Sequence, residues 1–311
     1  MQQRVATGRY TLVVALLAGT AAWVASALWP ADASWPVVAG GYAAYLATGL
    51  LLIALNKTFS FIRLQLTLPM SVFFLLVAAC PPLHRFTGEA AGCVLLLLAV
   101  YSLFYSSQQA VPTTGALFYT FAFLGLGSLF FPRLVLFVPL FVLGAYRLQS
   151  LTWKSLMGSV VGLLFPCWML LAYALMKDNM TLFYRPFEQM VHFAPLMEGK
   201  FRAWEWAVLG YLLVTYLISM FRILMSGFEG KVSTRNYLTF FGWLCLYLFA
   251  YLVLQPADVT CMLPFLLIGN SVLMANYLAT TNSLLSNLVF IAGEAGIVAL
   301  YLYNVVELGW I

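Results

Sequence analysis

The stretch NLVFIAGEAGIVALYLYN, residues 287–304, decides the fold class of this 311-residue chain. It is apolar nearly throughout. An α-helix rises about 1.5 Å per residue, so a helix of this length crosses most of the roughly 30 Å hydrocarbon core of a bilayer. One charged residue, Glu294, lies near its middle. The stretch therefore predicts a transmembrane helix that holds a carboxyl group deep in the membrane.

The composition of the whole chain agrees with this prediction. Hydrophobic residues make up 64% of the sequence and charged residues only 8%, whereas soluble domains carry roughly 25% charged residues. A water-facing surface cannot be built from so few charges, so we predict an integral membrane protein. The net charge of +5 is spread along the chain without a basic cluster. We therefore expect no nucleic-acid partner.

The sequence contains further apolar segments long enough to approach a membrane crossing. We predict an all-α fold, a polytopic bundle of about eleven transmembrane helices that forms a single domain over 1–311. The fifth and sixth segments are short and are separated only by Pro132 and Arg133, so they form either two crossings or a re-entrant pair. The predicted segments lie near 10–29, 37–55, 66–81, 90–106, 116–131, 134–146, 155–176, 206–222, 237–254, 260–279 and 284–305.

The distribution of Lys and Arg between the loops predicts the orientation, because cytoplasmic loops are enriched in these residues. If the N-terminus is inside, the cytoplasmic loops carry nine basic residues and one acidic residue. The opposite loops carry six basic and eight acidic residues. We therefore predict that the N-terminus is inside and the C-terminus outside.

The longest segment between predicted crossings is 177–205, on the predicted outer side. Its aromatic residues and its charges of both signs are typical of a helix that lies in the headgroup layer. A second interpretation makes it a lid over an outward-facing site, with Arg185 binding an anionic headgroup and Glu188 or His192 moving protons. These three residues are spaced three and four apart, which places them on one helical face. Pro186 would then lie in the first turn.

Glu294 lies too far from either end of its helix for its short side chain to reach water. Asn287, Glu294 and Tyr301 recur every seven residues and form one stripe, and Gly293 and Gly296 beside it allow another helix to come near. We expect the stripe to face protein and the carboxyl group to be hydrogen-bonded to a neighbour. The alternatives are a proton or cation relay and a direct contact with a substrate.

Other motifs indicate packing. Gly158 and Gly162 form a GxxxG pair, which is typical of closely approaching helices in lipid. The five cysteines lack the spacing of a metal site, and we predict neither a metal nor a cofactor. The polar residues Asp258, Asn270, Ser271, Asn276, Asn282 and Ser283 gather in the C-terminal third. They form either a polar cleft or hydrogen bonds between helices.

The chain resembles two groups of known membrane proteins, one in two stretches of sequence and one in its layout. FLGLGSLFFPRLVLFVPLFVLGAYRLQSLTWKSLMGSVVGLLFP at 123–166 and LPFLLIGNSVLMANYL at 263–278 resemble an uncharacterised family of multi-spanning inner-membrane proteins of Bacteroidota. That resemblance implies a location in a bacterial inner (cytoplasmic) membrane. The layout is more distantly similar to type C glycosyltransferases, which use lipid-phosphate sugar donors. This similarity implies that Asp32, in the first outer loop, acts as a catalytic acidic residue.

Three functions stay open at this point. In the first, the protein acts on envelope lipids or lipid-linked glycans, with Asp32 as base, Arg185 or Arg202 holding phosphate, and membrane lipids such as a polyprenyl-phosphate as partners. In the second, it is a noncatalytic subunit of an envelope complex whose polar stripe holds a helix of another membrane protein. In the third, it is a proton-coupled transporter that uses Glu294.

Overall fold

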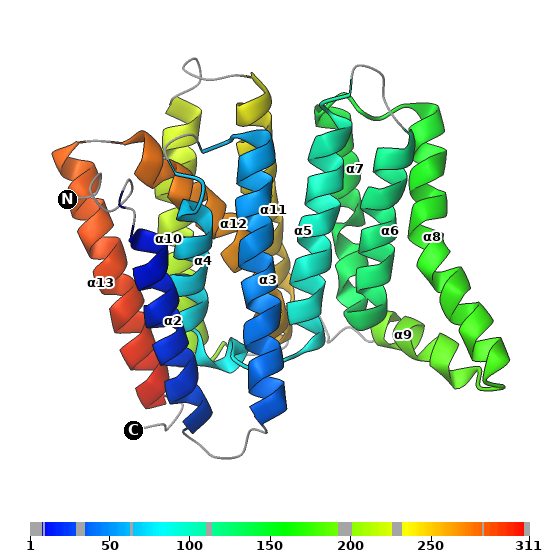
Figure 1. Cartoon of the computed structure of the whole chain (residues 1–311), viewed down its shortest axis with the longest axis horizontal. Coiled ribbons are helices and arrows are strands. Elements are labelled where there is room, and N and C mark those ends of the chain that lie inside the picture. Colours follow the sequence, from blue (N-terminus) through cyan, green and yellow to red (C-terminus); the bar gives the residue numbers. More distant parts are fainter. Residues whose placement is uncertain are drawn as a thin grey trace. The chain divides into compact units, whose positions relative to one another are not determined.

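The structure, a computed structural model, describes residues 8, 10–28, 35–62, 65–109, 114–191, 201–225, 232–281 and 283–307. Every regular element within these ranges is a helix (Figure 1), which confirms the all-α class. Seven helices among the described residues are long and apolar enough to cross a membrane. The protein is therefore an integral membrane protein built as a helical bundle.

The helices follow the predicted segments closely. The long ones are α3 (Trp35–Phe59), α5 (Gly88–Ser106), α8 (Trp153–Met176), α10 (Ala203–Met225), α11 (Val232–Leu254), α12 (Val259–Thr280) and α13 (Leu284–Glu307). The shorter ones are α2 (Thr11–Leu28), α4 (Leu68–Ala78), α6 (Thr114–Phe130), α7 (Val138–Arg147) and α9 (Thr181–Val191). Three 3₁₀ turns complete the described elements: η1 (Pro81–Leu83), η2 (Pro132–Phe137) and η3 (Pro256–Asp258).

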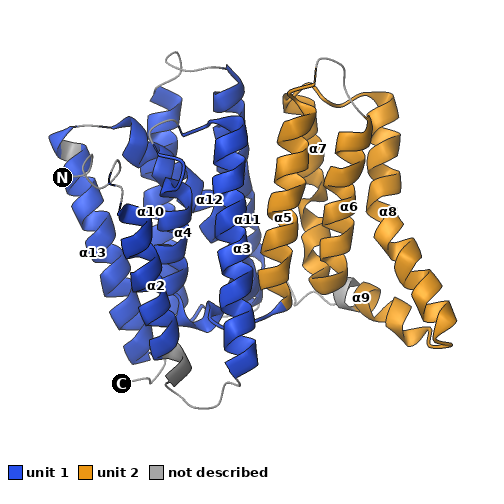
Figure 2. Ribbon diagram, in the orientation of Figure 1, with its two compact units in different colours: residues 1–87, 196–311 blue, residues 88–195 orange. Residues whose placement is uncertain are grey.

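The chain divides into two compact units, shown in different colours in Figure 2. Unit 1 contains residues 1–87 and 196–311, and unit 2 contains residues 88–195. Unit 2 is therefore continuous in sequence, whereas unit 1 is assembled from the two ends of the chain.

In unit 2 the most intimate contact joins α6 and α8, and it depends on the predicted GxxxG pair. A Cβ atom added to Gly162 would collide with the backbone oxygen of Phe118. A Cβ added to Gly125 of α6 would lie 2.5 Å from the backbone oxygen of Leu163. Small residues thus let the two backbones touch, which is how dispersion holds helices together in lipid. The structure confirms the packing role of this motif.

The chain returns between α6 and α8 through η2 and α7. Gly158, near the start of α8, lies against Thr114 at the start of α6, so the two helices run parallel. The six residues of η2 and the ten of α7 together cover about 27 Å at the rises of the 3₁₀ and α helices. This length is comparable to that of α6, so the return segment runs back along most of the helix.

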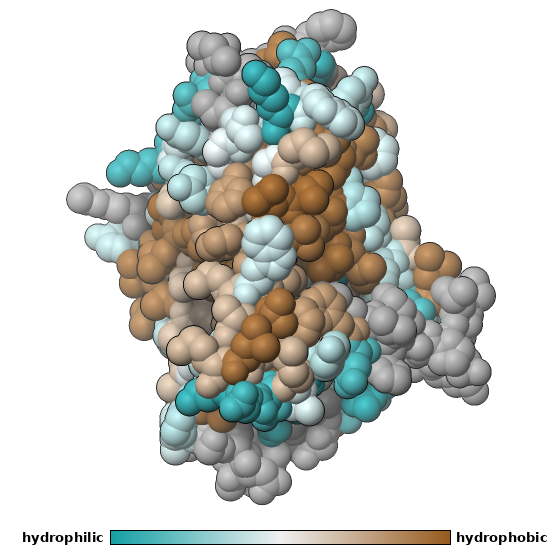
Figure 3. All heavy atoms as spheres, turned by 90° about the vertical axis from the view of Figure 1, so that its right-hand side faces the viewer, coloured by the Kyte–Doolittle hydropathy of each residue, from teal (hydrophilic) through white to brown (hydrophobic). Residues whose placement is uncertain are grey.

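The outer face of α8 is almost entirely apolar. Figure 3 shows a broad apolar band on this side of unit 2, with hydrophilic residues gathered toward its two ends. The band is the surface expected of protein in contact with acyl chains. The exposed large residues of α8 are Trp153, Met157, Val160, Val161, Leu164, Phe165, Trp168, Met169, Tyr173, Leu175 and Met176.

The core of unit 1 is built around α12. This helix contacts α4, α10 and α11, and every residue from Met262 to Asn276 is buried. A helix that is apolar all round belongs in the interior of a bundle. It therefore occupies the centre of unit 1, while its neighbours face outward.

Proline limits α4 to 11 residues, fewer than the predicted segment. Pro69 lies in its first turn, and Pro81 and Pro82 follow shortly after its last residue; proline at these positions starts a helix and prevents its continuation. Almost every residue of α4 is buried within unit 1. The irregular backbone at its ends is thus shielded by protein, the condition under which it is tolerated in a membrane.

Two buried polar side chains fix the ends of the first helices of unit 1. Asn56 accepts a hydrogen bond from Ile62 N at 2.9 Å and donates to the backbone oxygen of Leu66 at 3.3 Å, which holds the turn after α3. After the last turn of α4, the His84 ring stacks on Trp23 of α2 with ring centroids 4.1 Å apart. Its Nε2 donates to the backbone oxygen of Val77 at 3.2 Å. Burial lowers the pKa of His84 to about 4.

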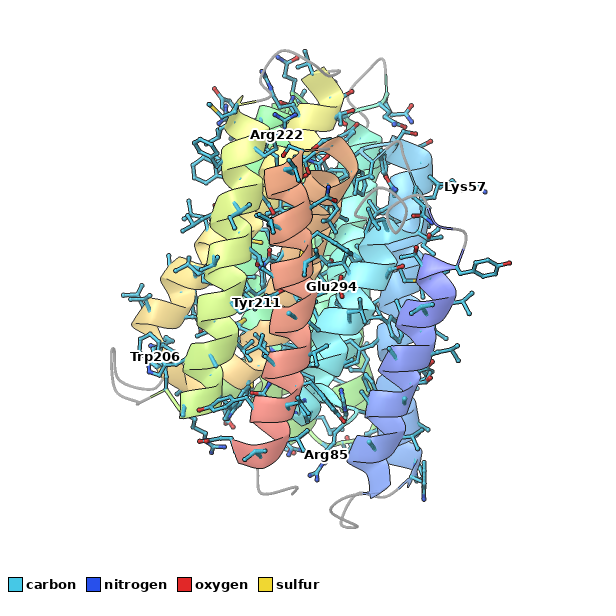
Figure 4. All side chains as sticks on the ribbon, turned by 90° about the vertical axis from the view of Figure 1, so that its left-hand side faces the viewer. Lys57, Arg85, Trp206, Tyr211, Arg222 and Glu294 are labelled. Atoms are coloured by element: carbon cyan, nitrogen blue, oxygen red, sulfur yellow. The ribbon has the colours of Figure 1, made fainter. Side chains whose placement is uncertain are left out.

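Figure 4 shows how labelled side chains distribute along unit 1. Lys57 and Arg222, both predicted on the cytoplasmic side, lie toward one end of its helices. Arg85, in a predicted outer loop, and Trp206, the first residue of the predicted crossing 206–222, lie toward the other end. These four residues therefore mark the two ends of the helices of unit 1.

Candidate functional site

The membrane-embedded site is built on α13. Asn287, Glu294 and Tyr301 lie on one stripe of this helix, as their spacing of seven predicts, and all three are half-buried. Glu294 follows the first residue of α13 by ten positions and precedes the last by thirteen. Its backbone is therefore about 15 Å and about 20 Å along the axis from the two ends of the helix.

The helix that approaches this stripe is α10, and its contact residue is Tyr211. A Cβ atom added to Gly296 would lie 2.7 Å from Cε2 of the Tyr211 ring, so the ring fills the space that a glycine leaves. The Tyr211 hydroxyl donates to the backbone oxygen of Gly293 at 3.0 Å. Gly293 and Gly296 thus admit a neighbouring helix, as the sequence indicates.

Tyr211 also lies within electrostatic range of the Glu294 carboxyl group. Figure 4 shows both residues at the same level of unit 1, in the middle of α10 and α13. The tyrosine hydroxyl proton is directed to the Gly293 carbonyl, and among the described residues no group donates a hydrogen bond to Glu294. The carboxyl group expected to bond to a neighbour thus has no donor within the described part of the chain.

This arrangement is costly in a membrane. A charged acidic side chain at the centre of a transmembrane helix costs about 2.5–3.5 kcal/mol on insertion scales. Ionisable residues at this depth are therefore rare, and they generally belong to functional or association sites. Glu294 lies between the covered face of α13, which includes Phe290 and Ile297, and its exposed face, which includes Ile291 and Val298. Its carboxyl group is therefore accessible from one side of the helix.

The other polar residues of the C-terminal third join helices. The fully buried Asn270 of α12 donates from Nδ2 to Leu212 O at 2.8 Å and to Thr215 Oγ1 at 3.1 Å, both on α10. Asn304 of α13 donates to the backbone oxygen of Ala79 at 2.6 Å. These contacts favour hydrogen bonding between helices over a polar cleft.

The remaining polar residues of this region are dispersed. Asp258 is buried at the start of α12 and accepts a hydrogen bond from the Tyr251 hydroxyl at 2.5 Å. Ser271 donates to Ile268 O within its own helix at 2.8 Å. Asn282, which the cleft interpretation includes, lies outside the described residues. Asp258 and Ser271 are thirteen positions apart, about 20 Å along the helix axis, and each bonds to a residue near it in sequence.

The predicted outer segment contains α9, a helix with a strong separation of apolar and polar residues. Arg185 and Glu188 both lie on it, three residues apart, and both are exposed. The expectation that Pro186 lies in the first turn is wrong, because α9 begins at Thr181 and Pro186 is inside the helix. The earlier start has a physical cause: Asn179 Oδ1 accepts a hydrogen bond from Thr181 N at 3.2 Å.

The other candidate residues lie outside the described ranges or in the other unit. Asp32 and His192 lie outside the described residues. Arg202 belongs to unit 1, whereas α9 belongs to unit 2. The backbone N–H of Arg202 donates to Glu205 Oε2 at 2.8 Å, and this bond satisfies a donor at the start of α10. The side chain of Arg202 is exposed.

Sequence reasoning missed Tyr211 as part of the site. The two glycines of α13 indicate that a bulky side chain can approach, but they do not identify the helix that supplies it. A hydroxyl-bearing aromatic residue in the middle of an apolar helix is a signal that could have singled out Tyr211, because its hydroxyl group needs a hydrogen-bond partner in lipid.

Comparison with protein-family models, with curated proteins and with solved structures found no match. Among the described residues, no group of three or more His, Cys, Asp or Glu side chains is placed to hold a metal ion.

Proposed function

We propose that the protein resides in a bacterial inner membrane and crosses it about eleven times, with the N-terminus inside and the C-terminus outside. Seven long apolar helices support the membrane location. The other four predicted crossings correspond to α2, α4, α6 and the η2–α7 segment. The separation of Lys57 and Arg222 from Arg85 in unit 1 supports the alternating topology. The resemblance to inner-membrane proteins of Bacteroidota is the basis for the choice of membrane.

We further propose a role in envelope lipid or lipid-linked glycan metabolism at the outer leaflet. This proposal is based on the separation of aromatic and charged side chains on α9. Phe183 and Phe187 form a half-buried aromatic pair with ring centroids 5.0 Å apart, while Arg185 and Tyr184 are exposed. An amphipathic helix with this pattern suits the boundary between headgroups and acyl chains.

Arg185 is the residue that would recognise the lipid. A guanidinium group binds phosphate through two parallel hydrogen bonds, which a lysine ammonium group cannot reproduce. The α9 helix contacts α8, α6 and η2 in unit 2, so its position is fixed by folded neighbours. Partners of this kind include ordinary phospholipids and polyprenyl-phosphates. Because Asp32 and His192 lie outside the described residues, we propose a lipid role without assigning a reaction.

The test is purification from the native membrane with mass spectrometry of the retained lipids. We expect Arg185→Ala to lower the retention of phosphate-bearing lipid roughly fivefold, since one cation near an anionic surface contributes about 1 kcal/mol. Arg185→Lys should restore only part of it. Lys177→Ala is the control, because Lys177 is an exposed cation that precedes α9. Equal retention by Arg185→Ala and Lys177→Ala would contradict the proposal.

A further inference from the structure

The exposed face of α13 is the second surface with unexplained chemistry. Within unit 1 this helix contacts α10 and, to a smaller extent, α4 and η1. Its opposite face is open along the whole helix. The exposed residues of that face are Leu284, Leu288, Ile291, Ala292, Ala295, Val298, Ala299, Leu302 and Val306.

Lipid alone is a poor cover for this face, because Glu294 lies at its edge. The equally exposed face of α8 carries large apolar and aromatic side chains, and the one exposed charged residue of this helix, Lys154, lies in its first turn. Lipid satisfies such a face. Glu294 is half-buried in the middle of α13 and receives no hydrogen bond from the described residues. A carboxyl group at this depth requires a donor, and acyl chains offer none.

The chain does not supply that donor from the described part of unit 1. Figure 4 places Lys57 and Arg222 toward one end of the helices and Arg85 toward the other, while Glu294 is in the middle. Tyr211, the nearest hydroxyl group on α10, donates to the Gly293 carbonyl instead. A donor for Glu294 must therefore approach from the open side of α13.

We propose that the exposed face of α13 binds a transmembrane helix of a different membrane protein, which donates a hydrogen bond to Glu294 from an amide, hydroxyl or basic side chain at mid-membrane depth. Complementarity of hydrogen bonding selects this occupant. A second copy of this chain, packed symmetrically through α13, would bring no amide, hydroxyl or basic donor to Glu294, because the exposed residues at this level, Ile291, Ala292, Ala295 and Val298, are apolar. The small side chains of Ala292, Ala295 and Ala299 permit close approach of the partner backbone.

This inference is independent of the lipid role proposed for α9, since the two surfaces belong to different units. It concerns association, and it assigns no chemical step to Glu294. It also makes Glu294 a residue whose substitution changes the composition of a complex while the protein itself stays folded.

The experiment uses the full chain in its native membrane with a photo-crosslinking amino acid at position 295. The control position is 217 on α10, which is 56% exposed in the wild-type chain and lies on another lipid-facing surface. We expect an adduct with one membrane protein from position 295 and none from position 217. Glu294→Leu should lower the adduct yield at least fivefold, and Glu294→Gln should retain part of it, since an amide still hydrogen-bonds.

The identity of the adduct provides the decisive readout. The captured protein must carry a hydrogen-bond donor in the middle of a predicted transmembrane helix, and its replacement by leucine must lower the yield as Glu294→Leu does. Adducts only with lipid, or only with a second copy of this chain, would overturn the proposal, as would an adduct that Glu294→Leu leaves unchanged. The thermal midpoint of each variant in detergent separates loss of binding from loss of folding.

Discussion

The contact between α6 and α8 and the contact between α10 and α13 use glycine in different ways. In the first, Gly125 and Gly162 bring two backbones together, and the outward face of α8 is apolar. In the second, Gly296 accommodates only the ring of Tyr211, and Glu294 stays at the edge of the contact. The contact between α6 and α8 leaves no polar group in need of a partner, whereas the contact between α10 and α13 leaves a carboxyl group that no described residue of unit 1 satisfies.

The difference shows that exposure alone does not identify an interaction surface in a membrane protein. Both α8 and α13 expose a long apolar face, as expected of helices at the outside of a bundle. What distinguishes α13 is one polar group whose hydrogen-bonding demand the solvent cannot meet. The predictions below test these two contacts and the contact of His84 with Trp23, in order of decreasing expected effect.

The largest effect is expected from Gly162→Leu, because the added side chain must displace the backbone of Phe118. We expect unfolding free energy to fall by about 3 kcal/mol, the upper range for overpacking, and the thermal midpoint in detergent to fall by roughly 6–12 °C. The measurement is tryptophan fluorescence during heating. Gly115→Leu, on the same helix as Phe118, is the control, since nothing lies within 4 Å of its added Cβ. Similar midpoints for the two variants would mean that α6 and α8 are not in backbone contact.

A smaller effect is expected from acidification, through the stacking of His84 on Trp23 in unit 1. Burial lowers the pKa of His84 from 6.5 to about 4, so between these values the unfolded chain binds more protons than the folded one. Stability contributed by neutral His84 is therefore present above pH 6.5 and is lost as the pH falls toward 4. The loss between pH 7 and pH 5 should be about 2 kcal/mol.

His84→Phe provides the control for that pH dependence. Phenylalanine can stack on Trp23 as the imidazole ring does, but it does not titrate. The difference between wild type and variant in denaturant unfolding, measured at pH 7 and pH 5, isolates the contribution of this one residue. Identical pH dependence in both proteins would show that His84 is not buried against Trp23 in its neutral form.

The smallest effect is expected from Gly296→Leu. The added side chain meets the ring of Tyr211, which is only half-buried and can rotate, so we expect a loss of about 1 kcal/mol. The double variant Gly296→Leu/Tyr211→Ala should recover most of this loss, because the truncated residue leaves room. Gly210→Leu on α10 is the control, since its added Cβ meets nothing within 4 Å. No recovery in the double variant would show that Tyr211 does not pack on Gly296.

Much of the fold follows from the sequence. Apolar length predicts the helices, and the GxxxG pair of α8 predicts a close helix contact. The limits of α4 and α9 were less accurate, because they depend on local features: the prolines that flank α4 and the side chain of Asn179 before α9. The division into two units was not predicted, since both units are bundles of apolar helices.

The candidate site was only partly predictable. The spacing of Asn287, Glu294 and Tyr301 identifies the stripe, and the adjacent glycines indicate a neighbour. Which helix approaches is a property of tertiary packing, and no local pattern links Tyr211 to a glycine 85 positions later in the chain. The stacking of His84 on Trp23 escaped prediction for the same reason.

The central position of α12 has a consequence for biosynthesis. Its neighbour α4 leaves the ribosome nearly 200 residues earlier, is too short to be a stable membrane segment alone, and obtains much of its cover from α12. Unit 2 is synthesised in between and can complete its own packing first. Nascent unit 1 must therefore keep its first half sheltered, within the insertion machinery or by a membrane chaperone, until the C-terminal helices emerge.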